Sequence, residues 1–155
     1  ARTLILETKG PRLFIGYAPV QTNKTAESII ELKRELVEYL GENPASNEEL
    51  EKIKDNNTLS LPGRWETIAS IARDISQISI YDLPDDYWKN YADNVRNLSL
   101  DHVIAVANNV IKPNDLTWVI VGDLKRIEEN VRNLEIGQII ILDSDGNQIK
   151  SKDNN

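Results

Sequence analysis

The residues that could carry chemistry are few, and the scarcest is histidine. The chain has 155 residues, with a single histidine, His102, and no cysteine. A protein zinc site normally takes several imidazole or thiolate ligands, so this chain does not hold a complete set. His102 follows Ser99 and Asp101 in what the sequence predicts to be the first turn of a helix, which favours a surface or capping role.

Carboxylates occur in pairs at four places in the chain. General acid–base chemistry needs one carboxyl group of a pair in an apolar pocket that raises its pKa. Two of the pairs open predicted helices, where the exposed amides stabilise negative charge without any catalytic role. A calcium loop is not indicated either, because in DSDGN the glycine comes fourth and no closing glutamate follows. The pairs are Glu48–Glu49, Asp85–Asp86, Glu128–Glu129 and Asp143/Asp145.

Aromatic residues gather at Tyr87, Trp88 and Tyr91. An exposed cluster of this kind could stack on sugars or clamp a peptide. Tyrosines four residues apart on a helix can equally pack against neighbouring elements, so both interpretations stay open. With no phosphate-binding glycine loop, and no base for a serine nucleophile other than His102, we predict no catalytic, cofactor-binding or metal-binding residue in this chain.

The elements that would position these residues follow from apolar spacing and caps. Strands are predicted at 3–6 and 12–20, and again at 116–121 (LTWVIV) and 138–142 (QIIIL). Helices are predicted from Thr25, from a capping box at Ser46, along 68–79, after Asp85–Asp86, after Ser99 and between the last two strands.

This order predicts an α+β fold, with helices layered on one face of a mostly antiparallel sheet. The last strand–helix–strand unit could form a right-handed parallel crossover. We expect one domain over residues 1–142 and a polar, mobile tail over 143–155. Replacing Val119 or Ile120 with aspartate should unfold the domain if 116–121 is a buried strand.

Charge excludes some classes of partner. The chain carries 25 acidic and 18 basic residues, for a net charge of −7. Nucleic acids and anionic membranes both select basic surfaces, so neither is an expected partner.

Four stretches, read in order, resemble one known pattern. They are YAPVQTNKTAESI (17–29), SLPGRWETIASIA (60–72), LPDDYW (83–88) and IKPNDLTWVIVGD (111–123). Together they resemble the insulinase/pitrilysin-type zinc peptidases, and in particular the second, C-terminal domain of such a unit. The likeness covers nearly all of residues 1–146 and is closest to the large bacterial envelope members.

The resemblance implies one half-shell of a metallopeptidase chamber. Family members enclose peptides between two such half-shells, and the zinc ligands, H-x-x-E-H plus a later glutamate, lie in the first domain of the active half. An Arg…Tyr stretch in the other half contacts substrate. This chain carries neither motif. The resemblance therefore implies a non-catalytic C-terminal domain without its N-terminal part. Zinc and catalysis would belong to other domains of a parent metalloendopeptidase.

The expected partners are those catalytic domains and, through the assembled chamber, peptide substrates. The resemblance suggests the periplasm or cell envelope as the compartment. An uncovered sheet edge near residues 4–6 or 14–15 would also promote self-association. Two alternatives remain: a non-catalytic scaffold or assembly subunit of the same family, and an independent peptide- or glycan-binding module built on Tyr87, Trp88 and Tyr91.

Overall fold

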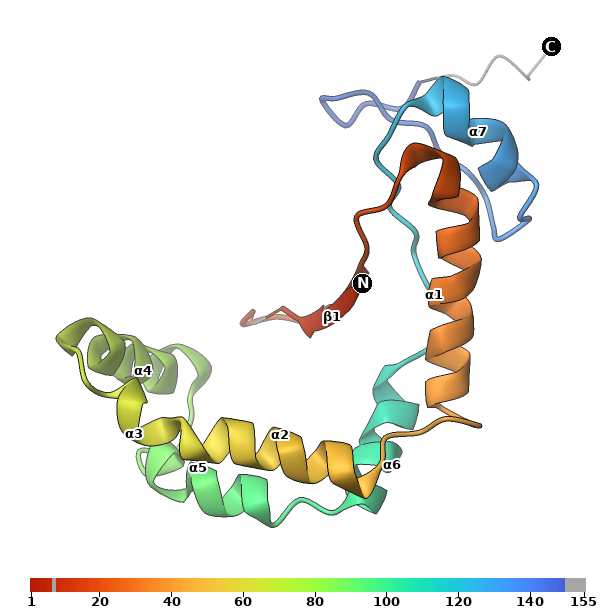
Figure 1. Ribbon diagram of the computed structural model, residues 1–155. Coiled ribbons are helices and arrows are strands. Elements are labelled where there is room, and N and C mark those ends of the chain that lie inside the picture. The colour runs from red at the N-terminus through yellow and green to blue at the C-terminus, as the bar shows by residue number, and fades with distance from the viewer. Residues whose placement is uncertain (7, 150–155) are drawn as a thin grey trace. The chain divides into compact units, whose positions relative to one another are not determined.

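The chain combines helices with a small sheet, which agrees with the prediction of mixed helix and strand (Figure 1). The computed structural model describes residues 1–6 and 8–149. The elements in chain order are β1 Arg2–Ile5, β2 Phe14–Tyr17, the 3-10 turn η1 Thr22–Lys24, α1 Thr25–Tyr39, α2 Asn47–Leu59, α3 Leu61–Arg64, α4 Ile68–Tyr81, α5 Tyr87–Arg96, α6 Leu100–Val110 and α7 Leu124–Arg132.

Two compact units make up the structure. Unit 1 comprises residues 1–18 and 32–117, and unit 2 comprises residues 19–31 and the chain from 118 onward. The single domain over 1–142 stays a prediction.

Side-chain caps explain where several helices begin. The capping box predicted at Ser46 is confirmed: its hydroxyl accepts the Glu49 N–H, and the Glu49 carboxylate accepts the Ser46 N–H. Thr67, Ser99 and Asp123 accept backbone N–H groups in the same way at the starts of α4, α6 and α7. These starts depend on residues close in sequence, so the sequence predicts them well.

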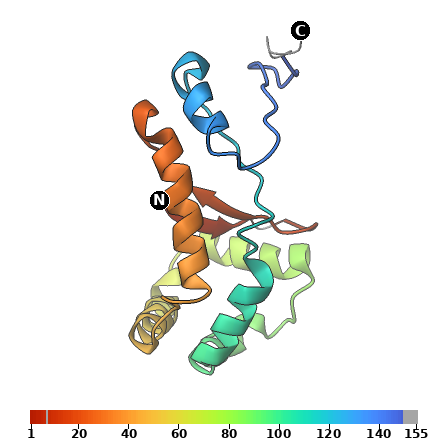
Figure 2. The same cartoon turned by 90° about the vertical axis from the view of Figure 1, so that its right-hand side faces the viewer.

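The sheet of unit 1 is a two-stranded antiparallel hairpin, drawn as paired arrows in Figure 2. Its register pairs Arg2 with Tyr17 and Ile5 with Phe14, and Leu6 donates its N–H to the carbonyl of Leu13. Both predicted N-terminal strands are therefore present. β1 lies one residue before the predicted 3–6, and β2 is shorter than the predicted 12–20.

The two predicted C-terminal strands are not formed. Residues 116–121 have no strand assignment, and of 138–142 only Leu142 pairs, in an isolated bridge to Gln148. The prediction assumed burial on both faces, but Val119 is 84% exposed and Val121 95% exposed. A strand also needs a neighbouring backbone, and none is paired with 116–121 here. The parallel crossover is consequently absent from the described residues.

The buried interior of each unit is small. In unit 2, Ile29, Ile127 and Val131 form a cluster against which Trp118, Ile120, Leu134, Ile136 and Ile139 pack. Figures 1 and 2 show α7 beside η1 and the first turn of α1, as this cluster requires. In unit 1, the buried apolar residues Leu50, Leu61 and Ile111 are joined by three buried polar ones, Lys54, Thr58 and Asp74.

The start of the predicted tail folds into a turn. Asp143 donates its N–H to the Asn147 carbonyl, and Ile149 donates its N–H to the Ile141 carbonyl. The remainder of the predicted mobile tail, 150–155, lies outside the described residues. None of the helices within the described ranges is long and apolar enough to cross a membrane.

Candidate functional site

The histidine and the carboxylate pairs do not converge on one site. His102 lies exposed in the first turn of α6, and its backbone N–H binds the Ser99 hydroxyl. Within residues 1–6 and 8–149, no group of three or more His, Cys, Asp or Glu side chains is placed to hold a metal ion.

Several of these carboxylates have local structural roles instead. Glu49 completes the capping box, and hydrogen bonds from the backbone and hydroxyl of Ser46 lower its pKa. Glu128 pairs with Arg132 one helical turn later. Asp143 accepts the N–H groups of Asp145 and Asn147, and these bonds, that of Asn147 foremost, lower its pKa.

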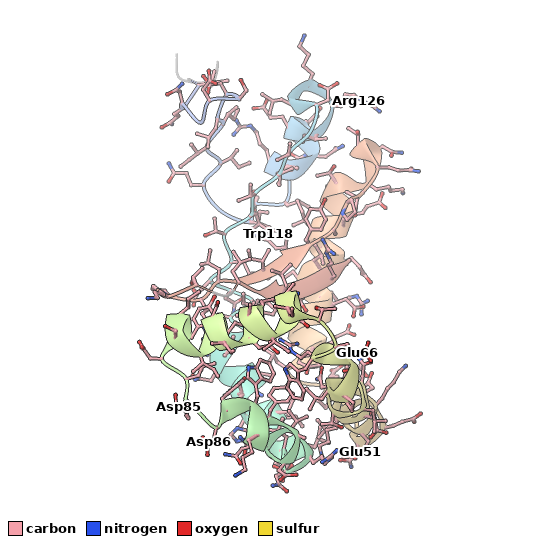
Figure 3. All side chains as sticks on the ribbon, turned by 90° about the vertical axis from the view of Figure 1, so that its left-hand side faces the viewer. Glu51, Glu66, Asp85, Asp86, Trp118 and Arg126 are labelled. Atoms are coloured by element: carbon pink, nitrogen blue, oxygen red, sulfur yellow. The ribbon has the colours of Figure 1, made fainter. Side chains whose placement is uncertain are left out.

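The Asp85–Asp86 pair opens α5, as expected. Figure 3 places both residues on the turn between α4 and α5. Asp86 occupies the N-cap position, but its carboxylate accepts from the Asn90 side chain at 2.7 Å rather than from a backbone N–H. Both residues are exposed, so the pair lacks the apolar surroundings that acid–base catalysis needs.

The carboxylate with the most distinctive surroundings is Asp74 on α4, which the sequence analysis did not single out. It is 3% exposed. Arg64 Nε and Nη2 donate to its two oxygens, each at 2.7 Å, and Trp65 Nε1 donates to Oδ2 at 2.8 Å. This forked geometry is the strong form of an arginine–carboxylate pair. The Asp74 carboxylate therefore joins α4 to α3 and the residue that follows it.

Aromatic rings surround this ion pair. The Arg64 guanidinium lies 4.3 Å from the centre of the Trp88 ring, and Trp88 Nε1 donates to the Asp74 carbonyl at 3.4 Å. Trp88 is also edge-on to Tyr87 at 5.1 Å and to Trp65 at 6.2 Å, and it packs against Tyr91 at 5.2 Å. We call the set Arg64, Trp65, Asp74, Tyr87, Trp88 and Tyr91 the Asp74 cluster. It brings together the three aromatic residues singled out from the sequence.

The electrostatics of the Asp74 cluster suit an anchor rather than an acid or base. The hydrogen bonds from Arg64, with a smaller contribution from Trp65, hold the pKa of Asp74 below its ordinary value despite burial. The same pairing raises the pKa of Arg64. Both groups stay charged at neutral pH, and both carboxylate oxygens are occupied, so Asp74 is not poised to transfer a proton.

Anchoring through Asp74 turns the apolar side of α4 outward. Ile68, Ile71 and Ile75, spaced along one helical face, are 88%, 41% and 62% exposed. Between Ile68 and Tyr81 the only charged residues are Arg73 and Asp74, so this face carries no charge. A stripe of isoleucines at helical spacing ordinarily faces a core, whereas these three side chains face outward. We call Ile68, Ile71 and Ile75 the α4 face.

Sequence reasoning missed the Asp74 cluster because its members are far apart in the chain. Arg64 and Asp74 are ten residues apart and belong to different helices, so no short motif joins them. The available signal was the Arg73–Asp74 pair, which holds the only charged residues of this helix, because a charged residue needs a partner when it is buried.

Comparison of the chain with protein-family profiles, with curated proteins and with solved structures gave no match. The two features of the chain that bear on its function are the Asp74 cluster and the α4 face.

Proposed function

We propose that this chain is a non-catalytic domain of an insulinase/pitrilysin-type zinc peptidase. In this proposal it completes the wall of the parent enzyme's peptide-binding chamber and has no activity of its own. Zinc and the catalytic groups belong to another domain of the parent. The observation that carries the proposal is the α4 face, an uncharged apolar surface that another domain would cover.

The Asp74 cluster supports this role because it fixes the orientation of α4. The polar side of the helix is tied to Arg64 and Trp65, so Ile68 and Ile75 stay outward. A surface held rigidly in its binding orientation loses little entropy when it docks. Burying an exposed isoleucine contributes roughly 1.5–3 kcal/mol, so the three residues of this face could supply several kcal/mol.

We also propose the layered arrangement of helices and sheet that the sequence predicts. In the assembled parent, helices would lie on one face of a mostly antiparallel sheet, as in a metallopeptidase half-shell. The antiparallel pairing of β1 with β2 is compatible with that arrangement.

An independent peptide- or glycan-binding role has less support. Tyr87, Trp88 and Tyr91 are half-buried, and Trp88 packs against the other two and against Arg64. A ring engaged in this way offers little free surface on which a sugar or peptide could stack.

Calorimetric titration of the chain with the parent's zinc-binding domain, the one with H-x-x-E-H, tests the proposal. The variant Ile75→Lys should bind at least roughly tenfold more weakly than wild type, because a lysine in the interface must be desolvated without a partner. Ile53→Lys on α2 is the matched control, since Ile53 is 55% exposed and Ile75 is 62% exposed.

Equal losses in the two variants, or none, would contradict docking through the α4 face. A parent without any H-x-x-E-H domain would instead favour the scaffold alternative, in which a related domain serves assembly only.

A further inference from the structure

We draw no further inference here: the strongest candidate, the exposed apolar side chains of Ile5, Leu13 and Tyr17 on the β1–β2 hairpin of unit 1, carries no more than the self-association already expected from the sequence, because nothing in the structure shows what covers this face.

Discussion

Asp74 is a charged residue buried in the interior of unit 1, where most small cores have an apolar side chain. It is buried, and its carboxylate accepts two hydrogen bonds from Arg64 and one from Trp65, so the cost of burying its charge is offset by these two residues. A buried ion pair of this kind is costly to break even where it adds little net stability, because one partner is left without compensation.

Asp74→Asn should destabilise unit 1 by about 2–3 kcal/mol. This is less than the cost of breaking a fully buried ion pair, because the Arg64 side chain is 36% exposed and water can solvate its charge. Asp93→Asn is the matched control, since Asp93 pairs with Arg96 at 3.5 Å on the surface. The control should change stability by less than about 0.5 kcal/mol. Urea unfolding followed by circular dichroism measures both, and equal effects would show that Asp74 is no anchor.

The lowered pKa of Asp74 gives the chain a pH-dependent stability. The unfolded state binds a proton near pH 3.9, whereas the folded state binds it only at lower pH. The stabilisation is therefore complete above about pH 5 and is lost as pH falls through the folded pKa. Stability of the wild type should fall more steeply than that of Asp74→Asn below about pH 5. Parallel curves would contradict this assignment.

Helix starts were predictable from sequence because their causes are local. Ser46 and Ser99 accept N–H groups three residues away, and such pairs are visible in the chain itself. Strands at 116–121 and 138–142 were not predictable in the same way, since a strand forms only beside another backbone. The inward side of α4 likewise depends on the distant Arg64, and the isoleucine stripe alone indicated the opposite face.

From the sequence alone, aspartate at either Val119 or Ile120 was predicted to unfold the domain. In the structure only Ile120 packs on a core, so the two substitutions should differ in their effect on stability. Ile120→Asp should destabilise unit 2 by about 2–3 kcal/mol, because this side chain packs on the unit 2 core. Val119→Asp should cost less than about 0.5 kcal/mol, because Val119 is 84% exposed. Thermal unfolding of the two variants compares them directly. If both unfold the chain, 116–121 is a buried strand after all.

At the scale of the whole molecule, exposed apolar surface is the dominant feature. The β1–β2 hairpin alone exposes Ile5 and Tyr17 by 53% and 51%, beside unpaired strand edges. Open edges of this kind tend to pair with one another unless a charge prevents it.

Sedimentation velocity should therefore detect reversible self-association that increases with concentration. Ile5→Lys should reduce it, because an edge lysine opposes pairing, while Ile53→Lys on α2 should not. A wild-type chain that sediments as a clean monomer at every concentration would remove this prediction.

We propose that this chain completes a chamber whose zinc lies elsewhere in a parent enzyme. The most direct measurement is hydrolysis of a quenched fluorescent peptide by the parent's zinc-binding domain, with and without this chain. We predict no activity from this chain alone, activity from the mixture, and much less when Ile75→Lys replaces the wild type. Full activity of the zinc-binding domain without this chain, or equal activity with Ile75→Lys, would contradict the claim.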